Sequence, residues 1–249
     1  MAIQTTEGII LRKQNLRETS VILSLFTKDF GKISGVMKGA RGPKAAMGNN
    51  PQVFSLNNIV FYDKKRGNLN SISQCDLKNY FDPIRNDLER TVYADYFLEL
   101  VDSVTIEGDI NREIYELLLN SLGLLSRPVS AKRVARIFEI KIMDMSGFMS
   151  ELGECIVCSE PIQENARFSL CLGGPLCRKC QTKDKGAINL SKGTMNFIER
   201  VRRSPFELVS RIKVSQDVGI ELEGFLRRFV DYHIQRSLKT VEFLKKIKL

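Results

Sequence analysis

The sequence has no tryptophan and a single histidine among its 249 residues. His233 cannot be assigned as a catalytic base without a readable nucleophile, and it is expected to be a hydrogen-bonded structural residue. The catalytic patterns Gly-x-Ser-x-Gly and His-Glu-x-x-His do not occur. The loop around Gly39 and Gly42 does not have the spacing of a nucleotide-binding P-loop. These absences predict a protein that is not an enzyme.

Long hydrophobic runs are also missing. No stretch reaches the ~20 apolar residues that a membrane-spanning helix needs, and residues 1–12 lack the layout of a secretory signal peptide. The sequence therefore predicts a cytoplasmic protein that does not use a membrane. Thiols stay reduced in that compartment.

Acidic residues are fewer than basic ones. The 38 lysines and arginines against 29 acidic residues give a net charge of +9, while 43% apolar and 27% charged residues are ordinary for a folded protein of one or two domains. Residues 1–80 carry 12 basic and five acidic side chains, a net charge of +7. An even spread would give about +3 over this segment. Such local excess favours a polyanionic partner, foremost nucleic acid.

Residues 1–81 contain five short runs rich in Val, Ile and Phe, at residues 8–11, 21–26, 32–37, 53–62 and 69–75, separated by turn residues. Short strands at this spacing favour a small barrel. Five strands in about 80 residues is the count of an OB-fold, a partly open Greek-key barrel. The sequence therefore predicts an OB-fold nucleic-acid-binding domain over residues 1–81.

Residues 82–249 show mainly helical periodicity. Leu88, Val92, Tyr96, Leu100 and Val104 recur at a spacing of four, and similar stripes follow up to residue 148. Three helices fit this stretch. Further helical patterns cover residues 191–203 and 215–238. The predicted fold is α+β: an OB-fold barrel, then a mostly α-helical domain over residues 82–249.

Five of the six cysteines lie between residues 155 and 180. Cys155 and Cys158 form one Cys-x-x-Cys pair, and Cys177 and Cys180 form a second after 18 intervening residues. This is the spacing of a closed four-thiolate zinc site, which is structural because no coordination position stays open for water. A disulfide pair or idle thiols are the alternatives, and a reducing cytoplasm argues against disulfides. Cys171 is a spare thiol.

The basic residues of the first domain are concentrated in two loops. One begins at Lys38, directly after a strand pattern, and the other is the hairpin at residues 64–68. OB-folds bind single strands with a basic groove and stacking aromatic rings. The predicted DNA-binding residues are Arg12, Lys13, Lys38, Arg41, Lys44, Lys64, Lys65 and Arg66. The candidate stacking rings, for which a core position is the alternative, are Phe26, Phe30, Phe54, Phe61 and Tyr62.

Several stretches resemble one bacterial family. Glu7-Gly8-Ile9-Ile10-Leu11 is similar to its opening strand and Glu18-Thr19-Ser20 to its second hairpin. Lys38-Gly39-Ala40-Arg41 is similar to its basic loop, and Phe168-Ser169, Gly173-Gly174 and Cys177-Arg178-Lys179-Cys180 are similar to its zinc segment. The family is RecO, the recombination mediators of bacterial DNA repair. The resemblance extends over nearly the whole chain.

The resemblance implies more than composition does. RecO proteins bind single- and double-stranded DNA and anneal complementary strands without ATP. With RecR, and in many species RecF, they load RecA onto strands coated by single-strand-binding protein, whose acidic C-terminal tail they contact. The resemblance also implies a structural role for Zn²⁺ and a protein associated with the nucleoid. A zinc-containing RNA-binding protein and a non-catalytic adaptor remain alternatives.

Overall fold

A computed structural model of the chain describes residues 2–42, 51–63, 69–209 and 214–246. The chain forms two compact units. The first contains residues 1–131 together with 238–249, and the second contains residues 132–237.

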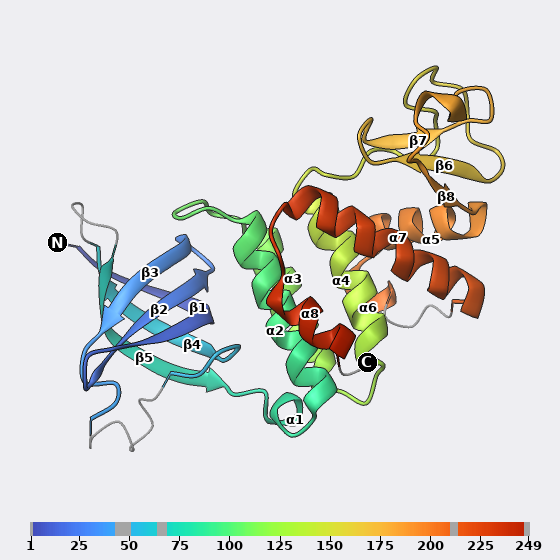
Figure 1. Ribbon diagram of the computed structural model, residues 1–249. Coiled ribbons are helices and arrows are strands. Elements are labelled where there is room, and N and C mark those ends of the chain that lie inside the picture. Colours follow the sequence, from blue (N-terminus) through green and yellow to red (C-terminus); the bar gives the residue numbers. More distant parts are fainter. Residues whose placement is uncertain (1, 43–50, 64–68, 210–213, 247–249) are drawn as a thin grey trace. The chain divides into compact units, whose positions relative to one another are not determined.

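The first unit begins with a closed barrel of five strands, β1 (Ile3–Leu16), β2 (Ser20–Thr27), β3 (Gly31–Met37), β4 (Leu56–Tyr62) and β5 (Asn70–Asn79) (Figure 1). The strand order is β1-β2-β3-β5-β4. Only β3 and β5 pair in parallel, and they do so over Gly35–Met37 and Asn70–Ile72. The predicted OB-like barrel followed by helices is confirmed.

Two strand boundaries differ from the sequence prediction. Strand β1 has 14 residues, far more than the predicted run at residues 8–11, because its first half pairs with β4 from Ile3 opposite Tyr62 onward. The fourth strand begins at Leu56 and not at Val53. The reason is Phe54, whose φ of 48° is left-handed and incompatible with a strand.

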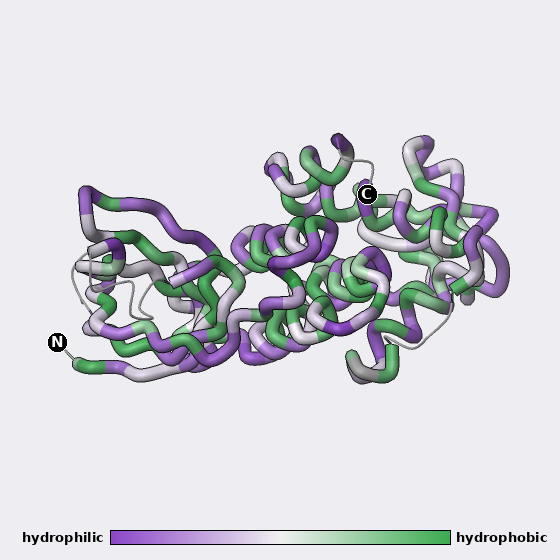
Figure 2. Tube along the Cα trace, turned by 90° about the horizontal axis from the view of Figure 1, so that it is seen from below, coloured by the Kyte–Doolittle hydropathy of each residue, from purple (hydrophilic) through white to green (hydrophobic). Residues whose placement is uncertain are grey.

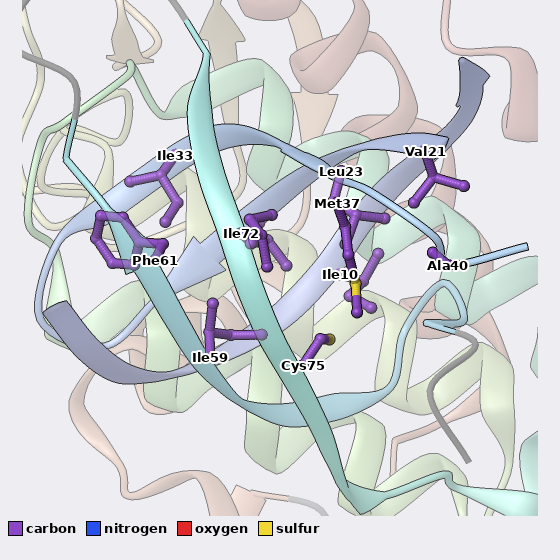
Figure 3. Close-up of a cluster of buried hydrophobic side chains, with 11 residues drawn as sticks. Ile10, Val21, Leu23, Ile33, Met37, Ala40, Ile59, Phe61, Ile72 and Cys75 are labelled. Atoms are coloured by element: carbon purple, nitrogen blue, oxygen red, sulfur yellow. The ribbon is translucent and has the colours of Figure 1, made fainter. Parts of the chain in front are cut away.

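Hydrophobic and hydrophilic residues alternate along the barrel strands (Figure 2), as expected when one face of each strand points inward. The inward side chains form a buried cluster of eleven residues, ten of them labelled in Figure 3: Ile10, Val21, Leu23, Leu25, Ile33, Met37, Ala40, Ile59, Phe61, Ile72 and Cys75. Cys75 is a small buried hydrophobe, and burial raises the pKa of its thiol to about 12. This core holds the barrel strands, and therefore the ends of the loops between them, in place.

Four helices complete the first unit: α1 (Asp82–Arg85), α2 (Leu88–Val104), α3 (Arg112–Leu125) and α8 (Lys239–Lys246). Asp87 and Asn111 cap the N-termini of α2 and α3 by accepting backbone N–H groups. Glu99 on α2 accepts from the backbone N–H of Lys239 and Thr240 at 2.9 and 3.1 Å. That contact fixes the start of α8 against α2.

The second unit holds α4 (Ala131–Met145), α5 (Lys192–Arg203), α6 (Phe206–Val209) and α7 (Gln216–Ile234). The predicted helices at residues 191–203 and 215–238 are present, but α7 ends at Ile234 because Gln235 adopts a left-handed φ of 50°. Residues 151–190 form the cysteine segment, with a three-stranded sheet of β6 (Ala166–Ser169), β7 (Gly174–Leu176) and β8 (Ile188–Leu190). No pattern in the sequence predicted this sheet.

No helix within the described ranges is both long enough and apolar enough to cross a membrane. Hydrophilic residues interrupt the apolar ones throughout the tube in Figure 2.

Candidate nucleic-acid interface and metal-binding cysteines

One end of the barrel gathers four basic side chains, which we call the cationic end: Lys13, Arg17, Lys38 and Arg41. Arg17 lies in the turn between β1 and β2, and the loop after β3 folds against that turn. The Arg41 backbone N–H donates to Thr19 O at 3.0 Å, and its guanidinium donates to Arg17 O at 3.4 Å. Burial and the charge of Arg41 lower the pKa of Lys13. The turn after β1 and the loop after β3 thus bring Lys13, Arg17 and Arg41 together, and Lys38 directly follows β3.

The loop that carries Lys38 and Arg41 is anchored in the core. Ala40 is buried in the barrel cluster, while its neighbours Lys38 and Arg41 are exposed. Gly39 supplies the left-handed φ of 72° that the turn requires, and the Gly42 N–H donates to Gly39 O at 3.1 Å. The loop therefore presents its two cations to solvent from a fixed backbone.

Other barrel cations are paired with acidic side chains. Arg12 forms an ion pair with Asp102 on α2, although it precedes Lys13 directly. Successive side chains of a strand point to opposite faces, so one of these two residues faces α2 and the other lies near Arg41. Lys28 and Lys78 pair with Glu116 and Glu7 in the same way. Within the described part of the chain, Arg17, Lys38 and Arg41 form no ion pair with an acidic residue.

The predicted residues thus fall into three groups. Lys13, Lys38 and Arg41 come together, and Arg12 is instead paired with Asp102. Lys44, Lys64, Lys65 and Arg66 lie outside the described residues. Sequence reasoning missed Arg17, an isolated arginine in a turn; the only available signal was its position at the tip of a predicted hairpin.

The aromatic residues divide by burial. Phe26, Phe54 and Phe61 are 0%, 4% and 3% exposed, so they are core residues and cannot stack on a base. Phe54 also lies beneath the guanidinium of Arg85, 4.0 Å from its carbon. Of the five candidates, Phe30 and Tyr62 are partly exposed.

The four cysteines of the two Cys-x-x-Cys pairs converge in the cysteine segment. The Sγ atoms of Cys155, Cys158, Cys177 and Cys180 all lie within 4.8 Å of one another, and those of Cys158 and Cys177 are 3.7 Å apart. A tetrahedron with Zn–S bonds of about 2.3 Å has edges of about 3.8 Å. These thiols are therefore positioned to bind one metal ion.

Local backbone geometry explains the convergence. The Cys155 carbonyl accepts from Ser159 N–H at 2.8 Å and the Cys177 carbonyl from Cys180 N–H at 2.9 Å, so each pair sits on a tight turn. Ile156 N–H donates to Pro175 O at 2.9 Å and joins the two turns. A Cβ on Gly174 would come within 2.9 Å of Ile156 Cβ, so glycine is needed for this approach.

The environment of Cys155 favours a thiolate. Burial raises its pKa, but backbone N–H groups of Cys177, Val157 and Cys158 outweigh that effect and lower the pKa to about 6. The Cys177 N–H lies 3.4 Å from Cys155 Sγ. Metal ligation needs the thiolate form, which this environment favours at Cys155 only; burial and the neighbouring thiols raise the pKa of Cys180 to about 12, so that thiol would ionise only with the charge of a bound metal.

The spare thiol lies outside the cluster. Cys171 Sγ is 3.3 Å from Ser169 Oγ and 3.5 Å from Asp184 Oδ2, in the loop after β6. It is not part of the four-thiol group.

His233 is a packing residue. Its ring centroid lies 4.8 Å from that of Phe148 and 4.5 Å from that of Phe229, and burial lowers its pKa. The expectation of a hydrogen-bonded histidine was wrong for Nε2, which is buried with no partner among the described residues.

The architecture defines the class: an OB-like barrel protein with an appended helical region and a segment in which four thiols are positioned to bind a metal ion. Comparison with family profiles narrows this class to one family. Residues 1–81 match "Recombination protein O N terminal" and residues 85–242 match "Recombination protein O C terminal". The chain belongs to the RecO family.

Relatives that align over nearly the full length of the chain bear the same family name. The chain is 33% identical to the DNA repair protein RecO of Alkaliphilus metalliredigens over 97% of this chain and 98% of that one. It is 31% identical to the DNA repair protein RecO of Acetivibrio thermocellus over 96% of this chain and 95% of that one, and 32% identical to that of Symbiobacterium thermophilum over 98% and 97%.

Proposed function

We propose that this chain is a non-enzymatic mediator of DNA repair and recombination. It binds single- and double-stranded DNA and anneals complementary strands without ATP. With RecR, and with RecF where present, it helps load RecA onto strands coated by single-strand-binding protein, whose C-terminal tail it contacts. The observation that carries the DNA-binding part is the cationic end on the barrel of a RecO-family chain.

The proposed mechanism is charge neutralisation. Two DNA strands repel each other, and a shared cationic surface lowers that repulsion and holds them together. Residues 1–81 are proposed as the DNA-binding domain and residues 82–249 as the helical domain. Phosphates bind at Lys13, Lys38 and Arg41 together with Arg17, and the remaining predicted contacts are Lys44, Lys64, Lys65 and Arg66. Arg12 contributes less because its guanidinium is held by Asp102, a carboxylate that it shares with Lys32.

The direct test is annealing of two complementary labelled oligonucleotides, without nucleotide, across a salt series. The strands are used bare and coated with single-strand-binding protein. Rapid, salt-sensitive annealing on both supports the mediator. Annealing on bare strands alone contradicts the partner contact, and annealing on neither contradicts the proposal and makes binding to RNA the next measurement.

The salt dependence locates the surface. If about five phosphates are engaged, the log–log slope for single-stranded DNA is about −3.5. The double variant Lys38→Glu with Arg41→Glu should weaken binding by at least about tenfold at low salt and flatten the slope by about 1.4.

A matched control separates local contact from net charge. Lys183→Glu with Lys185→Glu changes the net charge by the same amount on exposed residues of the cysteine segment. It should leave the slope unchanged. Equal losses in the two double variants would refute this placement of the DNA.

We further propose that the four cysteines hold a structural Zn²⁺. The four-thiolate donor set suits zinc and leaves no open position for chemistry. Metal bound there would join the turns at Cys155 and Cys177 and hold the short strands of the cysteine segment in place. Cys155→Ser should lower zinc content and stability together.

A further inference from the structure

The aromatic rings of the barrel domain can all be placed. Residues 1–81 contain seven aromatic side chains, and none of them falls within residues 43–50 or 64–68. Four rings are 0–4% exposed and cannot reach a ligand: Phe26, Phe54, Phe61 and Phe81. A base can therefore stack only on the rings that are half-buried, which are Phe30, Tyr62 and Tyr80.

None of these three rings is offered to a strand at the cationic end. Phe30 lies in the turn that precedes β3, whereas the loop of the cationic end follows β3. Tyr62 pairs with Ile3 at the start of β1, whereas the turn of the cationic end follows β1. The guanidinium of Arg85 already covers one face of the Tyr80 ring, with its carbon 3.8 Å from the ring centroid.

The sheet face beside the cationic end has no ring either. Alternate residues of β2 and β3 point into the buried cluster, so the residues between them point outward. These outward residues pair across the two strands, Ile22 with Val36 and Ser24 with Ser34, and all four are half-buried. Methyl, methylene and hydroxyl groups thus form this face, and they give a base no π surface on which to stack.

The cationic end instead offers positive charge. Arg17, Lys38 and Arg41 are exposed, and Lys13 lies beside Arg41. Ammonium and guanidinium groups bind phosphate oxygens by charge-assisted hydrogen bonds, and such contacts carry no information about the base. The side chains at this end therefore suit the sugar-phosphate backbone and not the base.

We propose that the cationic end holds single-stranded DNA by its phosphates alone and leaves the bases unstacked and free to pair with a complementary strand. This inference rests on the proposed DNA binding and specifies how the strand is held. Bases that are stacked on protein rings must leave those rings before they can pair. A strand that is held by its phosphates can pair while it stays bound, which suits annealing without ATP.

The first test compares oligothymidine with an abasic oligomer of the same length, in which tetrahydrofuran replaces every nucleoside and the charge is unchanged. Fluorescence anisotropy with full-length protein should give affinities within about twofold and equal salt slopes. Abasic binding at least about tenfold weaker would overturn the inference, because one stacked base contributes about that much, and would leave DNA binding itself intact. Failure of both oligomers to bind would remove the proposed function and this inference with it.

A spectroscopic test looks for stacking directly. The fluorescence of 2-aminopurine within a DNA strand falls when this base stacks on a neighbouring ring. The fluorescence of the bound strand should not fall below that of the free strand. Quenching on binding would overturn the inference, and the variants Phe30→Leu, Tyr62→Leu, Tyr80→Leu and Phe243→Leu would identify the ring. Phe243 on α8 is included because its ring is 43% exposed.

A ring added to the outward face gives the opposite result if the placement is right. Ile22 lies two positions after the start of β2, next to the cationic end. Ile22→Tyr should tighten the binding of oligothymidine several-fold, leave the abasic oligomer unaffected and slow annealing. The matched control, Thr5→Tyr, adds the same ring at an exposed position opposite Val60 and should behave as the wild type does. Equal behaviour of the two tyrosine variants would overturn the assignment to the cationic end.

Discussion

The barrel and the cysteine segment stabilise their strands by different means. The barrel has five strands of seven to 14 residues closed around an apolar cluster. The cysteine segment has strands of four, three and three residues, and four of its thiols converge on one point. The barrel closes on its own apolar cluster, whereas the short strands of the cysteine segment are buried partly against α7, where Phe168 packs on Phe225 and Phe229.

This difference explains why closely spaced cysteine pairs occur in the cysteine segment and not in the barrel. Short strands bury too little apolar surface to offset the conformational entropy lost on folding. The Zn²⁺ proposed above would crosslink the two turns and add stability, because it binds the folded segment. The barrel needs no such crosslink, and its one cysteine, Cys75, is simply a buried side chain.

Metal removal should give the largest difference in stability between the cysteine segment and the barrel. Treatment with a strong chelator is expected to unfold residues 151–190, because metal binding to such sites is worth on the order of 10 kcal/mol. The barrel should remain folded. Hydrogen exchange followed by mass spectrometry reports each region separately, and Cys177→Ser should reproduce the result. Equal loss of protection in β1–β5 would remove the distinction between the regions.

A cavity in the barrel should have the reverse effect. Leu23 is fully buried in the apolar cluster, so Leu23→Ala is expected to cost about 3 kcal/mol in the free energy of unfolding. Urea unfolding of the barrel measures this, and zinc content should not change. Val36→Ala, on the half-buried face of β3, is the control and should cost about 1 kcal/mol or less. Metal loss in Leu23→Ala would contradict the independence of the two regions.

Lowering the pH should stabilise the first unit and destabilise the cysteine segment. Burial raises the pKa of Asp95 on α2 to about 6, against an opposing effect of Arg85, while Glu99 raises it further. The folded first unit therefore binds this proton more tightly than the unfolded chain. The resulting stability is present below about pH 4 and is lost as the pH rises through 6. The cysteine segment instead loses stability as the pH falls, because protonated thiols release metal.

Asp95→Asn isolates the first of these effects. It should stabilise the first unit by about 1–2 kcal/mol at pH 8 and give no gain at pH 4. Thermal unfolding at the two pH values measures the difference. A gain that is the same at both would mean that Asp95 does not titrate as described.

The smallest effect is expected at Cys171. Its thiol lies beside Ser169 and Asp184 and outside the four-thiol cluster. Cys171→Ser should leave the metal stoichiometry unchanged and alter stability by no more than about 0.5 kcal/mol. Loss of metal in this variant would show that the ligand set was misassigned.

Much of the fold could be predicted from local patterns. Alternating apolar residues marked four barrel strands close to where they occur, and the spacing of Cys155, Cys158, Cys177 and Cys180 indicated the thiol cluster. The first half of β1 could not be found this way. Its residues lack a clear apolar alternation and are extended because they pair with β4, more than 50 positions later in the chain.

The role of single residues in the basic surface also could not be predicted from sequence patterns. Arg12 and Lys13 are neighbours with the same charge, and no sequence pattern separates them. The side-chain alternation of β1, together with an acid 90 positions away on α2, pairs Arg12 with Asp102. Arg17 became a candidate only because a hairpin and a loop anchored by Ala40 bring it to Arg41.

The sequence by itself determined the excess of positive charge in the first 80 residues, the barrel and helix periods, and the two cysteine pairs. These properties depend on residue type and on short spacings along the chain. Local sterics and the geometry of metal coordination act directly on both. Only the tertiary structure decided which cations are paired with acids, which aromatic rings are buried, and that the β1–β2 turn and the loop after β3 form one cationic end. Those outcomes depend on packing between residues far apart in the chain, and packing is settled when the whole core forms.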